Sequence, residues 1–174
     1  VMIMFLTGER LRKAVEDGLV QDLIHDETQV QPNGVDVTVS EIHEFSGPGK
    51  LDFSNGEREI PDTEKVEPEK KDEEDDYGWW KLEPGVYKVV MNEKVDIPNS
   101  LVGVAFPRSS LLRMGASTEN AYWDAGYSGG GAFMLRVENE KGIEIKENAR
   151  INQLGFIEVD EAEEGYDGIY GGEV

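Results

Sequence analysis

The stretch FPRSSLLRMGASTENAYWDAGYSGGG, residues 106–131, is the most informative part of the chain. It gathers arginine, serine, asparagine, tyrosine and glycine in an otherwise acidic sequence. Ser109 and Ser110 predict a loop that opens into a short helix, which Gly115 ends. Arg108 stands just before that helix, where a guanidinium and free backbone N–H groups together favour an anion. The stretch therefore predicts a phosphate-binding loop, although a serine-capped helix followed by a β-hairpin has the same local pattern.

The second half of this stretch predicts a tight turn. Asp124-Ala125-Gly126-Tyr127 places a carboxylate and an aromatic ring on that turn. Carboxylates near a phosphate-binding loop are candidates for general base catalysis.

Composition limits what such a site can bind. The chain has 174 residues, which is the size of one domain with its own core. Lys and Arg number 17 against 37 Asp and Glu, for a formal charge of −20. A chain this acidic repels nucleic-acid backbones and anionic membranes, so neither is an expected partner. It also repels a nucleoside triphosphate unless local cations or a metal reverse the field, which makes the few arginines informative.

The sequence contains no cysteine. Disulfides, thiol nucleophiles and cysteine-bound zinc are thereby excluded. The first six residues, VMIMFL, are too short for a signal sequence, and no other long apolar run follows. We therefore expect a cytoplasmic protein.

Short runs with strand character recur between turn signals along the chain. In the clearest, residues 35–40, valines alternate with polar residues. Asp36 falls on the polar side and is expected to be solvated. One short helix is expected near residues 7–18. Many short strands with little helix predict an all-β domain with minor α content, built as a barrel or sandwich. Further strands are expected at residues 85–90, 93–97, 101–106, 132–137, 143–145 and 151–159.

Two segments differ from the rest in composition. Residues 64–76 hold eight acids, three lysines and a proline, too polar to bury. We expect a single domain over residues 1–174 with an acidic loop inserted at about 61–78. Residues 165–174, rich in glycine and tyrosine, are expected to form a flexible C-terminal arm.

The sequence contains the pieces QPNGVDVTV, PRSSLLRMG, NAYWDAGYSGG, NARINQLGF and YDGIYGG, which begin at residues 31, 107, 120, 148 and 166. These five pieces resemble the dUTPase and dCTP deaminase superfamily, most closely its archaeal dUTPase branch. The resemblance implies a dUTPase-like β-clip, a distorted barrel, that forms a homotrimer with sites at subunit interfaces. It also implies hydrolysis of dUTP to dUMP and pyrophosphate with Mg²⁺.

The resemblance also implies roles for individual residues. Asp124 would activate the attacking water, and Tyr127 would pack under the deoxyribose. Mg²⁺ would be held mainly by the phosphates and water, with no direct protein ligand. Two alternatives stay open: an inter-subunit ion pair for Arg150 and a strand-end hydrogen bond for Gln153. The implied substrate-binding residues are Arg108, Ser109, Ser110, Asn120, Tyr127, Arg150, Gln153, Tyr166 and Tyr170.

A dCTP deaminase, or a bifunctional deaminase and dUTPase, is the competing enzyme on the same fold. Zinc-dependent deamination is excluded because it needs cysteine ligands. In the superfamily's deaminases, a glutamate stands three residues before an asparagine. Counting back three residues from Asn139 gives Arg136 in this sequence. A shifted strand would offer Glu138 instead. A non-catalytic nucleotide-binding trimer is a further alternative, which the presence of Asp124 disfavours.

Overall fold

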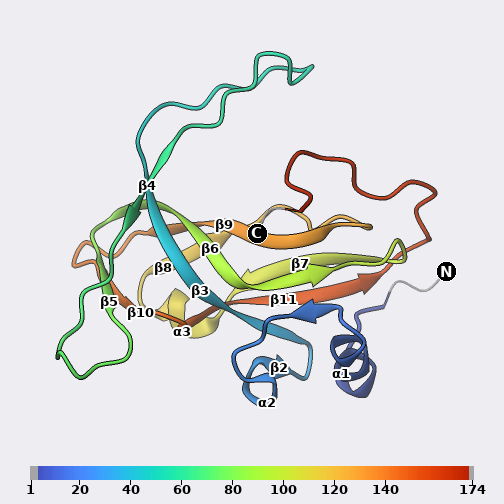
Figure 1. Ribbon diagram of the computed structural model, residues 1–174, viewed down its shortest axis with the longest axis horizontal. Helices are drawn as coiled ribbons and strands as arrows, with labels where there is room; N and C mark the ends of the chain where they lie inside the picture. Colours follow the sequence, from blue (N-terminus) through green and yellow to red (C-terminus); the bar gives the residue numbers. More distant parts are fainter. Residues whose placement is uncertain (1–3, 173–174) are drawn as a thin grey trace.

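The computed structural model describes residues 4–172, which are mainly β-strands (Figure 1). This confirms the prediction of an all-β fold with minor helix. The three helices are α1 (Gly8–Glu16), α2 (Asp26–Gln29) and α3 (Ser109–Arg113) within the described part of the chain. The strands are β1 (Val20–Gln21), β2 (Val30–Gln31), β3 (Gly34–Phe45), β4 (Thr63–Val66), β5 (Trp79–Leu82), β6 (Gly85–Asp96), β7 (Leu101–Pro107), β8 (Ala116–Glu119), β9 (Ser128–Val137), β10 (Ile143–Lys146) and β11 (Arg150–Glu158).

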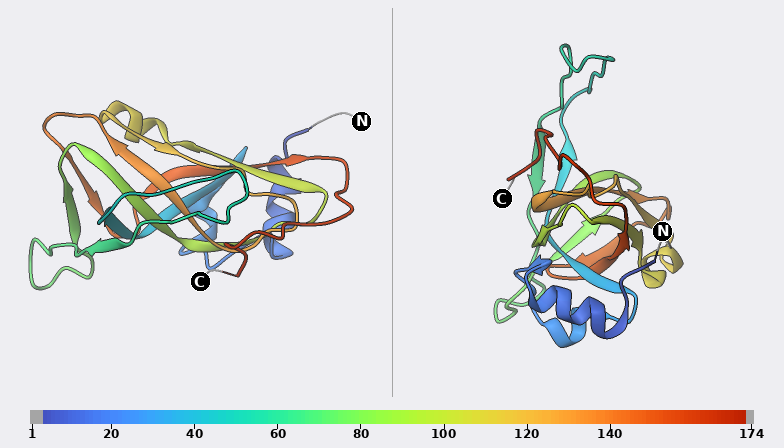
Figure 2. Two further views of the ribbon diagram at one scale, coloured as in Figure 1. Left: turned by 90° about the horizontal axis from the view of Figure 1, so that it is seen from above. Right: turned by 90° about the vertical axis from the view of Figure 1, so that its right-hand side faces the viewer.

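One large sheet curls into a nearly closed barrel. Its strands follow the order β7-β11-β3-β6-β9-β8, and the neighbouring pairs are antiparallel. The two ends of this path meet where Trp123, which follows β8, bridges Gly103 of β7. A Cβ atom on Gly103 would lie 2.9 Å from the Cβ of Trp123, so this close approach requires glycine. The end-on view shows the strands surrounding the interior, with α1 and α2 packed on one side (Figure 2).

The long central strands carry the core. β6 alternates buried and less buried residues along nearly its whole length, as expected of a strand with one face inward. β3 differs, because every residue from Gly34 to Val39 is buried. The polar side of this strand is therefore covered, and the strand does not face solvent there.

Two long connections leave the barrel: residues 46–62 between β3 and β4, and residues 67–78 between β4 and β5 (Figure 1). The acidic segment is consequently not a loop throughout. Its first part forms β4, which pairs with β3, and the Val66 carbonyl accepts a 2.7 Å hydrogen bond from the indole of Trp80. Among residues 4–172, every helix is too short or too polar to cross a lipid bilayer.

Candidate active site

A buried carboxylate organises the predicted phosphate-binding residues. Asp36 is 0% exposed, and its side chain contacts two guanidinium groups and one amide. Arg108 Nε lies 3.0 Å from Oδ2, and an Arg150 guanidinium nitrogen lies 3.2 Å from the same oxygen. Gln153 Nε2 donates to Oδ1 at 3.0 Å. Three of the residues expected to bind phosphate therefore converge on one carboxylate.

Strand order explains this convergence. β11 lies between β3 and β7, so Gln153 stands opposite Asp36 on one side and Phe106 on the other. Arg108 follows directly after β7, as the residue that caps α3. A register shift between Arg150 and Asn152 inserts one extra residue into β11. The resulting bulge brings Arg150 to the same side as Gln153.

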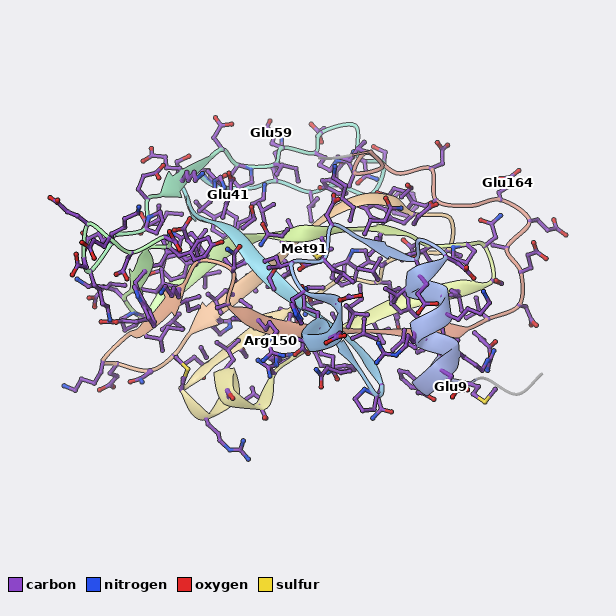
Figure 3. The ribbon with its side chains drawn as sticks, turned by 60° about the horizontal axis from the view of Figure 1, so that its bottom comes forward. Glu9, Glu41, Glu59, Met91, Arg150 and Glu164 are labelled. Atoms are coloured by element: carbon purple, nitrogen blue, oxygen red, sulfur yellow. The ribbon has the colours of Figure 1, made fainter. Side chains whose placement is uncertain are left out.

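Both guanidinium groups are fixed by the fold and yet remain accessible. Arg108 also donates to the Arg150 carbonyl at 3.0 Å, and Arg150 donates to the Thr28 carbonyl at 3.0 Å. Figure 3 shows Arg150 beside α2. Their side chains are 31% and 32% exposed, whereas that of Asp36 is 1% exposed. Two cations against one buried anion leave a net positive charge at the surface, which attracts anions in a chain of charge −20.

The two serines stand next to this pair at the start of α3. Ser109 and Ser110 are exposed. Within the described residues, their hydroxyls make no hydrogen bond, which leaves them free to donate to a ligand. The predicted serine cap is wrong, since Arg108 occupies the N-cap position and makes no side-chain capping bond.

Asp36 is a site residue that was not expected from the sequence. Its expected solvation is wrong, because β11 covers the polar side of β3 with Arg150 and Gln153. The sequence did contain a signal for this residue. Asp36 is a lone acid in an apolar strand, and a buried carboxylate needs cationic or N–H partners, which the two arginines elsewhere in the chain can supply.

A second group of predicted residues surrounds a cavity of about 380 Å³. Asp124 itself is exposed on the predicted turn, where its carbonyl accepts a 3.0 Å bond from the Tyr127 backbone. Tyr127 is buried, and its hydroxyl donates to the Gly130 carbonyl. Among the described residues that line the cavity, Lys88 is the only charged one. The lining comprises Phe45, Ile60, Pro61, Thr63, Lys88, Ala121, Tyr122, Trp123, Tyr127, Gly131, Ala132, Phe133, Met134, Tyr166 and Tyr170.

The C-terminal arm lies along this cavity within the same subunit. Tyr166 packs edge-on against Tyr127, with ring centroids 5.2 Å apart. The Tyr127 hydroxyl lies 3.2 Å from the Tyr170 carbonyl, and the Gly172 backbone donates to Ser128 at 2.9 Å. Figure 1 shows the arm returning from β11 toward β9. Both predicted arm tyrosines thus lie at the cavity that contains Tyr127.

A family model described as dCTP deaminase-like matches residues 5–159. The chain belongs to this family. It is 45% identical over 168 residues to a protein of Methanosarcina mazei named "probable deoxyuridine 5′-triphosphate nucleotidohydrolase", with 95% of each chain covered. It is 40% identical to the deoxyuridine 5′-triphosphate nucleotidohydrolase of Methanocaldococcus jannaschii, over 84% of this chain and 90% of that one.

A solved structure shares the fold of this family. The 2′-deoxycytidine 5′-triphosphate deaminase of Agrobacterium tumefaciens superposes with a TM-score of 0.68 at 19% sequence identity. The superposition covers 91% of this chain and 49% of that chain. The predicted dUTPase-like barrel is thereby confirmed.

Two residues bear on the choice between activities in the dCTP deaminase-like family. Arg136 lies within β9, where its guanidinium pairs with Glu119 at 2.9 Å. Glu138 follows the end of β9, and its backbone donates to the Gly115 carbonyl at 2.9 Å. Among the described residues that line the cavity around Tyr127, Arg136 and Glu138 are both absent, and so is Asp124.

The side chain of Asn120 is engaged inside the fold. Its oxygen accepts a 2.8 Å bond from Asn152, and its nitrogen lies 3.3 Å from the Thr118 hydroxyl. These contacts hold the start of the hairpin against β11. Binding of the substrate by Asn120 stays a prediction.

Metal binding depends on the donors present. Within residues 4–172, no three His, Asp or Glu side chains gather as metal ligands. The cluster of Arg108, Arg150 and Gln153 offers N–H donors, which suit phosphate oxygens and repel a cation. These residues fit a metal that arrives bound to a triphosphate.

Proposed function

We propose that this chain is a dUTP diphosphatase that hydrolyses Mg²⁺-bound dUTP to dUMP and pyrophosphate. The observation that carries the proposal is the convergence of Arg108, Arg150 and Gln153 on Asp36. Fixed guanidinium groups are strong receptors for phosphate oxygens. Relatives named as deoxyuridine 5′-triphosphate nucleotidohydrolases, at 40% and 45% identity, support dUTP as the substrate.

Asp124 is the proposed general base. Its exposed carboxylate would take a proton from a water molecule as that water attacks the α-phosphorus. The bond from the α-phosphorus to the oxygen bridging to the β-phosphorus then breaks, and pyrophosphate leaves. Mg²⁺ supplies charge neutralisation on the phosphates, and Arg108, Arg150 and the two serines hold the same groups.

The nucleoside is proposed to occupy the cavity beside Tyr127. The aromatic ring is buried and fixed at its hydroxyl, so it offers a rigid surface to the deoxyribose. Tyr166 and Tyr170 extend this surface, which supports their predicted contact with the substrate. The arm and the acidic insertion are proposed as appendages of a single domain.

A homotrimer with sites shared between subunits is also proposed. Arg108, Arg150 and Gln153 are not among the residues that line the cavity beside Tyr127, which supports a site completed by a neighbouring copy. Apolar side chains beside the Arg108 cluster support such a contact, because Phe106 is 63% and Leu112 54% exposed. The cytoplasmic location stays a prediction.

The competing deaminase reading lacks a suitable carboxylate. Deamination in this family was expected to need a glutamate at the position of Arg136 or a shifted Glu138. Arg136 is a cation paired with Glu119, and Glu138 lies beyond the end of β9. We therefore favour hydrolysis.

Incubation with dUTP and with dCTP, each with Mg²⁺, tests the proposal when pyrophosphate and ammonia are followed separately. We expect pyrophosphate from dUTP and no ammonia from dCTP. Ammonia from dCTP would establish the deaminase instead. Absence of both products, with dUTP bound, would identify a non-catalytic nucleotide-binding protein.

A further inference from the structure

Glu93 occupies a position in β6 that the strand pattern reserves for apolar side chains. The residue is 0% exposed although it is a carboxylic acid. Alternate residues of β6 point into the protein, and the other members of this buried set are apolar or aromatic. The set comprises Tyr87, Val89, Met91, Glu93 and Val95.

Burying a carboxylate costs several kcal/mol unless hydrogen bonds replace the lost water. Glu93 receives three such bonds. Gln29 Nε2 and Thr38 Oγ1 each donate to Oε1 at 2.6 Å, and the Thr38 backbone N–H donates to Oε2 at 2.9 Å. Within the described residues, Glu93 forms no ion pair, so these neutral donors alone satisfy it.

The same donors hold the strand that carries Asp36. Gln29 Nε2 also donates to the Asp36 carbonyl at 3.0 Å, so one amide group joins Glu93 to the backbone of Asp36. Thr38 lies two residues further along β3, on the same side as Asp36. A further bond of 2.9 Å, from Asn92 to the Thr38 hydroxyl, fixes that hydroxyl from a second direction. β3 is thereby anchored at Asp36 and again at Thr38.

We propose that Glu93 is a positioning residue for the phosphate-binding cluster. Through Gln29 and Thr38 it sets the place of Asp36, and Asp36 in turn sets the spacing of Arg108 and Arg150. Glu93 itself touches no substrate. The effect on catalysis rests on the proposed function, whereas the effect on the arginine geometry does not.

The chemistry of the three donors explains why a carboxylate is needed. Glutamate offers two acceptor oxygens with no hydrogen, and all three neighbours donate. A glutamine would turn an NH₂ group toward one of these donors. An apolar residue would leave the Gln29 amide and the Thr38 hydroxyl buried without acceptors.

The experiment compares Glu93→Gln with Val95→Ala, a matched control two residues along on the same buried face. The first readout is the Nε–H resonance of Arg108 in a ¹⁵N–¹H spectrum, assigned with Arg108→Lys. This group lies 3.0 Å from Asp36 and so reports its position. We expect the resonance to shift in Glu93→Gln and to stay in place in Val95→Ala. An unchanged resonance in a folded Glu93→Gln protein would overturn the proposal.

The second readout separates the two halves of the substrate. Inorganic tripolyphosphate should bind Glu93→Gln up to about 10²-fold more weakly, because a small displacement of the arginines misaligns several contacts at once. Deoxyuridine binding should be unaffected. Equal losses for both probes would indicate general destabilisation and contradict a positioning role. If the Arg108 resonance shifts but the wild-type protein does not hydrolyse dUTP, the proposed function fails while the positioning of Arg108 by Glu93 stands.

Discussion

Arg150 and Gln153 bond to the same carboxylate from one strand although three positions separate them. In a regular strand, residues an odd number apart point to opposite faces. The bulge between Arg150 and Asn152 removes this conflict, so the spacing R-x-x-Q works only with the extra residue. The bulge in the β11 backbone is therefore as necessary for the phosphate-binding cluster as the side chains of that strand are.

Replacing Asp36 with asparagine should damage both stability and activity. The substitution keeps the shape but leaves two guanidinium groups without their shared anion. Breaking such a buried pair costs about 3–5 kcal/mol of unfolding free energy. We also expect a higher KM for dUTP. Urea unfolding and steady-state kinetics measure the two effects, with Asp26→Asn, an exposed acid on α2, as the control. Wild-type stability in Asp36→Asn would contradict the buried cluster.

Glu93 should make stability depend on pH. Burial raises the pKa of Glu93 above its ordinary value, although hydrogen bonds from Thr38 oppose the shift. The folded state then holds the proton more tightly than the unfolded state. The stabilisation that Glu93 gives the folded state is therefore fully present at pH values below its pKa in the unfolded chain. It is lost as the pH rises through the pKa of Glu93 in the folded protein. The unfolding free energy of the wild type relative to Glu93→Gln should therefore fall as pH rises above the ordinary glutamate range.

Urea unfolding of both proteins from about pH 4 to about pH 8 measures this difference. The many exposed acids titrate alike in the two proteins and cancel in the comparison. A difference that stays constant or grows with pH would show that the pKa of Glu93 is not raised.

The strand pattern, the turns and the arginine-containing loop could be predicted from sequence because each depends on residues close together in the chain. Asp36 could not be assigned in this way. Its partners Arg150 and Gln153 lie 114 and 117 residues away, and only strand order brings them across β3. Alternation indicates which residues share a face, but it does not show whether that face meets water or another polar group.

The same limit applies to Glu93 and to β4. On its face of β6, Glu93 lies between the apolar residues Met91 and Val95. Its carboxylate oxygens nevertheless accept bonds from Gln29 and Thr38, which no local sequence pattern connects to it. β4 is too polar to be recognised as a strand from composition. It forms because the long strand β3 extends far enough to pair with it.

The acidic connection should be dispensable where it makes only surface contacts. Replacing residues 70–76 with a Gly/Ser linker should leave dUTP hydrolysis within a fewfold, because the contacts of Lys71 there are an exposed ion pair with Glu144 and a cation–π contact with Trp79. Removing β4 should by contrast destabilise the fold, since Val66 accepts the Trp80 bond. Thermal unfolding and kinetics of the two deletions check this. A loss of about two orders of magnitude in the linker variant, with folding intact, would give the segment a catalytic role.

Subunit mixing tests whether the phosphate cluster and Asp124 come from different subunits. Arg108→Ala and Asp124→Asn should each be inactive alone. If sites are shared, about a quarter of the sites in randomly mixed trimers contain both native residues, and activity returns to that level. The proteins are unfolded together, refolded and assayed, with each variant refolded alone as the control. Sites contained within one subunit would show no recovery.

The identity of the catalytic carboxylate is the remaining prediction. Asp124→Asn keeps the shape of the side chain and removes its basicity. Pyrophosphate release from dUTP should fall by about 10² to 10⁴, the usual contribution of a positioned general base. Binding of dUTP with Mg²⁺ should persist, because Arg108, Arg150 and the serines are untouched.

Glu138→Gln is the matched comparison. Glu138 lies beyond the end of β9 and has no part in the proposed hydrolysis, so its substitution should change the rate little. A deaminase with a shifted strand would reverse this order, and ammonia release from dCTP would vanish with Glu138→Gln. Near wild-type pyrophosphate release by Asp124→Asn would remove Asp124 from the proposed mechanism. Asp124→Asn and Glu138→Gln each replace one carboxylate with an amide. A difference between the rates of the two variants therefore reflects where the lost carboxylate stood and not the loss of a charge in itself.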